Sequence, residues 1–183
     1  MQRYWEWYYA TINATPPDQR AAPPDCTRAR DDDAWFLSVD VAGSVNGKPC
    51  SIPRGATLVF PVVHLLAVGG HKSCDAVIPQ IRSQMDAAGS PGSVSLDGGV
   101  LPSTALWRST SRECFPLETP LGGFGVKRRG DAEPELLTYA YSDGYWMILT
   151  LLRSGTHVLQ IRGQQWNGAF HPVEATYNLQ VTD

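Results

Sequence analysis

The sequence predicts a mostly β fold, best described as a β-sandwich of jelly-roll or immunoglobulin-like kind with one or two short helices. Three observations support this fold class. Apolar and polar residues alternate along several short stretches, turn residues separate these stretches, and the C-terminal third reads as consecutive strands. A closed β-barrel is the alternative architecture, because it too is built from short strands joined by turns.

The N-terminal segment, residues 1–15, is predicted to be a helix packed on the body of the domain. Its large apolar side chains recur at helical spacing: Trp5, Tyr8, Tyr9 and Ile12. Pro16 follows and ends the element. An aromatic platform for a ligand is the alternative interpretation of these rings. Residues 16–33 are expected to be an extended, linker-like segment, since they are rich in Pro, Asp and Arg.

Residues 34–183 are expected to form the β-rich body of a single domain, because a chain of 183 residues suits one core. Strands are predicted at 34–41, 57–66, 94–96, 105–109, 136–141, 145–152, 157–162 and 175–181. Pro61 predicts a bend or an edge position in the second of these strands. A helix is predicted near 75–88, with Ser73 as its N-cap and Gly89 after its last turn.

Composition and motifs exclude several classes of function. The formal net charge is -3, so the chain lacks the basic field that nucleic-acid binding requires. No apolar run reaches the roughly 18 residues of a transmembrane helix, and no membrane span is predicted. The phosphate-binding glycine loop, the zinc-protease helix and the nucleophile elbow are absent, so we predict no cofactor and no metal. Nothing in the sequence indicates an oligomeric state.

The cysteines predict the compartment. There are four of them, Cys26, Cys50, Cys74 and Cys114, and their even number and wide spacing favour two disulfides with three connectivities open. Disulfides persist in oxidising surroundings, so we predict a secreted or periplasmic protein whose leader is absent from this chain. A cytoplasmic protein with buried free thiols is the alternative. Metal binding by Cys74 with His71 and His64 is a further alternative.

The candidate catalytic residues are two histidines, a carboxylate and a guanidinium: His64, His157, Asp97 and Arg108. Histidine titrates near neutral pH, which suits acid–base chemistry, and Arg108 could bind a carboxylate or phosphate bidentately. These groups predict a small β-fold enzyme of cyclase, isomerase or hydrolase type. The alternatives are structural histidines, a turn aspartate before Gly98 and an internal ion pair for Arg108.

The candidate ligand-binding residues centre on Trp166, which lies in a Gly-Gln-Gln-Trp-Asn-Gly stretch predicted to be a loop. An exposed indole can stack on a sugar while the amides of Gln165 and Asn167 form hydrogen bonds. Trp107 and Tyr141 are further aromatic candidates, although Trp107, in a predicted strand, is also interpreted as a core residue. The sequence therefore favours a binding module for a glycan or small ligand, ahead of the enzyme and of a partner-binding or effector protein.

Several segments, spread over nearly the whole chain, form a recurring combination of short motifs. They are the Trp-rich N-terminus, the Cys-Ser-Ile-Pro-Arg-Gly stretch at 50–55 leading into Phe-Pro-Val-Val-His at 60–64, and Gly-Thr-His at 155–157. Together they resemble a family of uncharacterised exported bacterial β-rich proteins. The resemblance implies an exported fold in which Cys26 and Cys50 recur, and it implies no activity. The family pattern has asparagine where this chain has His64.

Overall fold

The computed structural model describes residues 1–14, 30–31, 34–39, 45–69, 71–118, 137–150, 152–166 and 168–183. Within these ranges the chain forms eleven strands, two α-helices and a short 3-10 turn at Ser103–Ala105, so the mostly β prediction is confirmed. The described strands belong to one mixed sheet whose path of neighbours runs from β1 to β3. Because these two end strands do not pair with each other, the sheet is open and the closed-barrel alternative is wrong.

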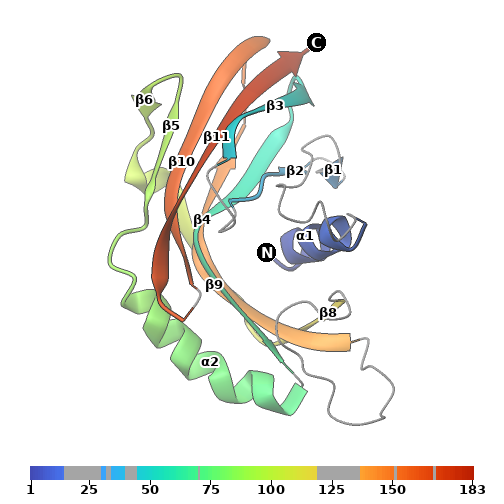
Figure 1. Ribbon diagram of the computed structural model, residues 1–183, viewed down its shortest axis with the longest axis vertical. Helices are drawn as coiled ribbons and strands as arrows, with labels where there is room; N and C mark the ends of the chain where they lie inside the picture. Colours follow the sequence, from blue (N-terminus) through green and yellow to red (C-terminus); the bar gives the residue numbers. More distant parts are fainter. Residues whose placement is uncertain are drawn as a thin grey trace.

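Four long strands form two antiparallel arms. One arm pairs β4 (Thr57–Gly69) with β9 (Leu137–Leu149) along their whole length. The other arm is the hairpin of β10 (Gly155–Trp166) and β11 (Phe170–Thr182). The arms join where β10 runs parallel to β4, at the pairs Gln164–Val63 and Gln165–His64. The sheet curves strongly around this junction (Figure 1).

Shorter strands extend each arm. On the first arm, β2 (Ala34–Phe36) pairs with β4 and β1 (Arg30–Asp31) pairs with β2, whereas β7 (Leu106–Thr110) and β8 (Phe115–Glu118) pair with successive parts of β9. On the second arm, β3 (Val45–Pro53) pairs with β11, β5 (Ser93–Leu96) pairs with β10, and β6 (Gly99–Val100) pairs with β5.

An irregularity between Pro61 and Val63 divides β4 into two halves. Proline has no N–H for the ladder and fits at such a bulge, in agreement with the bend predicted there. Beyond the bulge, Val63 and Leu65 pack with the residues under α2, whereas Leu66 packs with those under α1. The bulge therefore sets which side chains of β4 lie beneath each helix.

The two helices cover opposite faces of the sheet (Figure 1). α1 (Gln2–Ala14) lies within the predicted helical segment and buries aromatic side chains against Phe36 of β2 and Trp146 of β9. These buried side chains are Tyr4, Trp5, Tyr8 and Tyr9. α1 is thus attached to the sheet through its rings, as the core interpretation of the aromatic stripe expects.

α2 (His71–Asp86) covers the other face, where Ile81 and Met85 pack with residues of β4 and β9. The helix begins at His71, so Ser73 lies inside it and the predicted N-cap is wrong. Gly89 follows the helix with a φ of 76°, the left-handed conformation that glycine adopts readily after a helix.

The main core lies between the arms. Leu58 and Phe60 of β4 and Met147 of β9 share one buried cluster with the inward side chains of β10 and β11. These are Leu159, Ile161, Val173, Ala175, Tyr177, Leu179 and Val181. Because the sheet curves, side chains from strands that are not neighbours in it, such as β4 and β11, pack against one another in this core.

Two local predictions are wrong, and several strands were not predicted. The strands predicted at 136–141 and 145–152 are the single strand β9, which pairs with β4 and does not form a hairpin with β10. The strands that were not predicted are β1, β3, β6 and β8. Trp166 ends β10 and is not in a loop, because the hairpin register carries the ladder as far as Trp166 and Phe170.

Cys74 of α2 and Cys114, just before β8, form a disulfide. Cys50 is disulfide-bonded as well, and Cys26 lies outside the described residues. The metal alternative for Cys74 is wrong, because its sulfur is used in the disulfide. Of the residues described, no group of three or more acidic, cysteine or histidine side chains is placed to hold a metal ion. Neither described helix is long and apolar enough to cross a membrane.

Candidate functional site

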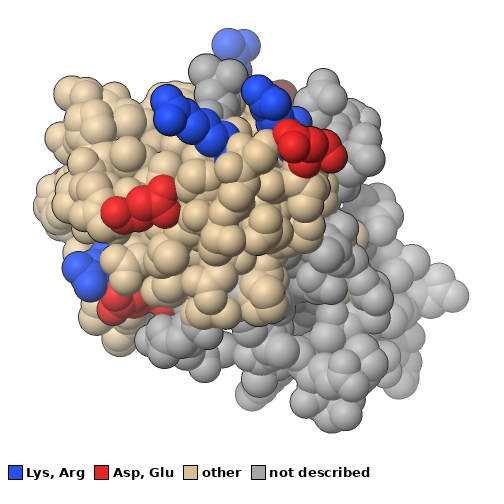
Figure 2. Space-filling model, turned by 90° about the horizontal axis from the view of Figure 1, so that it is seen from above, with Lys and Arg blue, Asp and Glu red and all other residues tan. Residues whose placement is uncertain are grey.

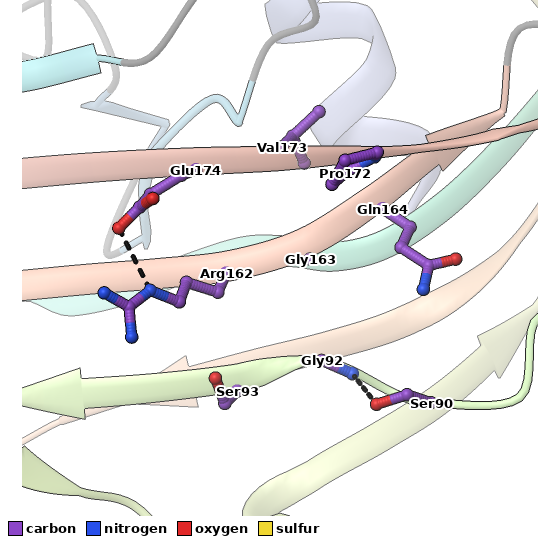
Figure 3. A pocket seen from close by; sticks show the side chains of 9 residues that line it. All are labelled: Ser90, Gly92, Ser93, Arg162, Gly163, Gln164, Pro172, Val173 and Glu174. Carbon is purple, nitrogen blue, oxygen red and sulfur yellow. Dashed lines mark hydrogen bonds and ion pairs between the residues drawn. The ribbon is translucent and has the colours of Figure 1, made fainter.

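A groove with a cavity volume of about 480 Å³ runs along the β10–β11 hairpin, beside the segment that enters β5 (Figure 3). Its lining comes from Ser90, Gly92 and Ser93 on one side and from facing positions of β10 and β11 on the other. Arg162 pairs with Glu174 and Gln164 with Pro172 in the hairpin register, so these four side chains lie on one face.

Two glycines form the floor of this groove. A Cβ atom on Gly163 would lie 1.6 Å from the carbonyl oxygen of Val62, and one on Gly92 would lie 2.5 Å from that of Arg162. Gly92 also has a φ of 80°. The backbone at Gly92, at Val62 and at Arg162–Gly163 therefore meets at contact distance, and only glycine permits this approach. The floor is bare backbone and the polar side chains stand around it.

The side chains around the floor supply hydrogen-bond donors and acceptors without a net charge. Arg162 Nε donates to Glu174 Oε1 at 3.0 Å, and the two side chains are 65% and 45% exposed. Gln164, Ser90 and Ser93 add an amide and two hydroxyls. The charges of Arg162 and Glu174 cancel. A ligand in the groove would therefore contact hydrogen-bond donors and acceptors with no net charge.

Trp166 and Phe170 continue the same ladder one strand repeat beyond Gln164 and Pro172, about 7 Å away. Their rings make an edge-to-face contact with centroids 5.1 Å apart. Both side chains are partly buried near α2. Gln165 points to the opposite face because side chains alternate along a strand, and its Oε1 has no partner within the described residues. Asn167 lies outside the described residues.

The other two aromatic candidates do not line this groove. Trp107 lies on β7 opposite Trp146 of β9 and is 52% exposed, so its core interpretation is wrong. Tyr141 is fully buried beneath α2, where its hydroxyl accepts a hydrogen bond from Arg82 Nε at 2.7 Å.

Of the catalytic candidates, the structure brings together His157 and Asp97. His157 Nδ1 lies 2.8 Å from Asp97 Oδ2, and its Nε2 lies 2.9 Å from the carbonyl oxygen of Arg153. The hydrogen bond to Asp97 raises the pKa of His157, and the same bond lowers the pKa of Asp97. A protonated ring donates to both acceptors, which leaves neither nitrogen to exchange a proton with a substrate.

His64 lies elsewhere, under α1. Its ring centroid is 5.4 Å from that of Trp5, and its Nδ1 has no hydrogen-bond partner within the described residues. Burial lowers the pKa of His64 to about 4, so the ring is neutral at pH 7. Gly144 stands opposite, where a Cβ atom would come within 3.1 Å of the Cα of His64. The nearest atom would be the carbonyl oxygen of Val63, at 2.6 Å, so the glycine permits β9 to approach the backbone of β4 closely here.

Arg108 lies on the face that α2 covers and forms an internal ion pair. Its Nε and Nη2 donate to Asp143 at 3.0 and 2.7 Å, and its Nη1 donates to Asp86 of α2. Thr110 Oγ1 also donates to Asp143, whose side chain is fully buried. Sequence reasoning missed Asp143, although a carboxylate within the apolar run of β9 was a signal that some cation must reach it.

Sequence reasoning also missed the groove itself. Its polar residues on β10 and β11 occupy ordinary strand positions of the hairpin, and the segment that enters β5 comes from a distant part of the chain. The one available signal was Gly163, a glycine inside an alternating strand, which is typical of close backbone approach.

Comparisons with known proteins do not identify a family for this chain. No protein-family model matches the chain, and no curated protein matches it. Among solved structures, the solution structure of amebosin aligns with a TM-score of 0.24 and 11% identity, over 82% of this chain and 100% of that chain. Similarity at this level carries no argument about fold or function.

Proposed function

We propose that this protein is a binding module for a neutral, polyhydroxylated ligand, such as a glycan, which docks in the groove on the β10–β11 hairpin. The observation that carries the proposal is a bare backbone floor surrounded by donors and acceptors that sum to no net charge. A sugar hydroxyl donates and accepts at once, so it suits such a rim. A phosphate or carboxylate would favour an unpaired cation, but Arg162 is already paired with Glu174.

The aromatic pair supports the same ligand class. Trp166 and Phe170 lie on the face that carries the groove, one repeat beyond Gln164. The apolar face of a sugar ring packs well on an aromatic ring, while its hydroxyls remain free for polar contacts. A ligand longer than one sugar could therefore reach from Arg162 to Trp166.

One face of the molecule shows charges of both signs side by side (Figure 2). Over the described part of the face in Figure 2, basic and acidic side chains are scattered among uncharged residues, with no broad patch of one sign. Attraction of a polyanion requires a concentrated basic field, which this face does not supply.

An enzyme remains the alternative, with less support. His157 and Asp97 form a pair at one end of the hairpin, His64 is buried under α1, and Arg108 is engaged beneath α2. General acid–base catalysis requires groups that converge on one substrate, and these candidates do not converge.

We further propose that the protein works outside the cytoplasm and that its arms pack as a β-sandwich. The Cys74–Cys114 disulfide supports the first proposal, since disulfides persist in oxidising compartments. The shared burial of Leu58 on β4 and Leu179 on β11, strands that are not neighbours, supports the second.

Calorimetric titration of the full chain against a panel of neutral and sulfated glycans tests the binding function. We expect a neutral glycan to bind, and Arg162→Ala, Gln164→Ala and Trp166→Ala each to weaken its binding about fivefold to tenfold. Arg54→Ala is the matched control, because it also removes an exposed ion pair, to Asp183 at 3.5 Å, outside the groove. Equal binding by all four variants, or binding of sulfated glycans alone, would contradict the proposal.

A further inference from the structure

A second, apolar cavity shares Gly92 and Ser93 with the groove. We propose that the ligand is an amphiphile, with a neutral polar headgroup in the groove and an alkyl or acyl tail in this cavity. A glycolipid has this chemistry. The inference rests on the proposed function for the headgroup and adds the tail as a second determinant of recognition.

The second cavity has a volume of about 380 Å³ and a different lining. Its walls are mostly hydrocarbon, from Val94, Val100, Leu101, Leu106 and Met147. The hydrocarbon lining offers few partners for sugar hydroxyls, and the volume accommodates several methylene groups.

The cavity lies where the two arms face each other without strand pairing. Val94 belongs to β5, which pairs with β10 and β6, whereas Leu106 belongs to β7, which pairs with β9. Val94 and Met147 are each 2% exposed and belong to the main core, and Leu101 packs against that core. The cavity is therefore an entrance from the surface to the interior between the arms.

Val100 stands at this entrance with 74% of its surface exposed, more than any other large hydrophobic residue described. A single exposed valine is ordinary on a protein surface. Here, however, Val100 lines a cavity that is also lined by the core residues Val94 and Met147. An alkyl tail bound in the cavity would therefore cover Val100.

The groove and the cavity share a wall, formed by Gly92 and Ser93. On one side of this wall lie Arg162, Gln164 and Glu174, and on the other lie hydrocarbon side chains. Because Gly92 has no side chain, nothing but backbone and the small Ser93 separates the two spaces. A ligand that fills both must be polar at one end and apolar at the other.

The test is a series of methyl, butyl, hexyl and octyl β-D-glucosides, titrated into the full chain below the concentrations at which they form micelles. Each fully buried methylene contributes up to about a fourfold gain in affinity, so we expect the dissociation constant to fall steeply along the series. Val100→Asp and Ser103→Trp should flatten this dependence, because the first charges the entrance and the second fills the cavity from an exposed position.

Val158→Asp is the matched control, since Val158 is also an exposed valine, 39% accessible, and lines neither space. It should keep the wild-type dependence on chain length. Arg162→Ala should weaken every glucoside by the same factor and leave the dependence unchanged. If Val100→Asp and Ser103→Trp also keep the wild-type dependence of affinity on chain length, the tail binds elsewhere and the inference is wrong.

1-Octanol, a tail without a headgroup, separates failure of this inference from failure of the binding function. If the glucosides bind with one affinity whatever their chain length and octanol does not bind, the groove function stands and the tail site does not. If octanol and octyl glucoside bind equally and Arg162→Ala affects neither, the cavity takes tails and the headgroup function is wrong. If none of these probes binds, the amphiphile inference is wrong, and the glycan panel decides the groove function separately.

Discussion

Two buried polar side chains, His64 and Asp143, lie on the paired strands β4 and β9 and are accommodated in different ways. His64 is kept uncharged, because burial lowers its pKa to about 4. Asp143 accepts two hydrogen bonds from Arg108 and one from Thr110, so its burial is compensated. The first arrangement makes the fold sensitive to acid, and the second makes it sensitive to loss of a partner.

The acid sensitivity from His64 has a definite sign. The native state binds the proton less tightly than the unfolded state, whose histidine has a pKa near 6.5, so His64 makes the protein less stable as the pH falls from about 6.5 towards 4. By pH 4.5 the loss should reach roughly 2 to 3 kcal/mol from this group alone. His64→Asn removes the titration and should flatten the pH dependence by that amount.

Urea unfolding of the wild type and His64→Asn at pH 7.5 and 4.5 measures this difference. The carboxylates titrate in both proteins, so their contribution cancels in the comparison. If the two proteins lose the same free energy of unfolding between these pH values, His64 does not remain neutral in the folded state.

Removal of the Arg108 side chain should lower the free energy of unfolding far more than removal of its exposed partner, Asp86. Arg108→Ala leaves Asp143 charged and fully buried without a cation, which costs about 3 to 5 kcal/mol. Asp86→Ala removes a side chain that is 63% exposed and should cost less than about 1 kcal/mol. Urea unfolding followed by tryptophan fluorescence compares the two, and similar losses would mean that Asp143 is not held by Arg108 alone.

At the scale of elements, α2 is held to the sheet by a covalent bond as well as by packing. The disulfide joins Cys74 in its first turn to Cys114, 40 positions later, just before β8. Cys74→Ser with Cys114→Ser should lower the free energy of unfolding by about 2 to 4 kcal/mol, because the unfolded chain regains the entropy of an open loop.

Thermal and urea unfolding of the double variant, beside the wild type with and without reductant, measures this loss. The reduced wild type should lose at least as much, because Cys50 is also disulfide-bonded. An unchanged midpoint in the double variant would show that packing alone fixes α2.

The elements that sequence patterns predict well are those with uniform burial. Helix α1 and the last strand, β11, were recognised because one face of each is apolar throughout. β9 was split into two predicted strands because Ser142, Asp143 and Gly144 interrupt its apolar pattern. Each has a tertiary reason to be there: Trp5 Nε1 donates to Ser142 Oγ, Arg108 neutralises Asp143, and Gly144 permits β9 to approach the backbone of β4 closely. None of these reasons is local.

At the scale of the whole molecule, the β content follows from alternation but the curvature does not. The sheet folds where β10 meets β4 through only two paired positions, Gln164–Val63 and Gln165–His64. Residues about a hundred positions apart make this contact, so no pattern within either segment encodes it. The groove is hard to predict for the same reason, since Ser93 and Gln164, about seventy positions apart, lie close together only because β5 pairs with β10.

Gly163 is the residue on which this crossing depends. A Cβ atom there would lie 1.6 Å from the carbonyl oxygen of Val62, and both partners are backbone, so neither can turn aside as a side chain would. Gly163→Ala should therefore force β10 away from β4 and destabilise the protein by about 3 kcal/mol or more. Gly99→Ala is the matched control, because its Cβ would meet nothing closer than a carbonyl oxygen at 3.4 Å.

Urea unfolding of the two glycine variants separates a local effect from one on the whole fold. The Gly99 variant should stay within about 0.5 kcal/mol of the wild type, as surface substitutions usually do. The Gly163 variant should also lose ligand binding, because the same glycine forms the floor of the groove. If it unfolds like the control, the arms do not cross at contact distance, and the folded sheet and the groove built on that crossing are both wrong.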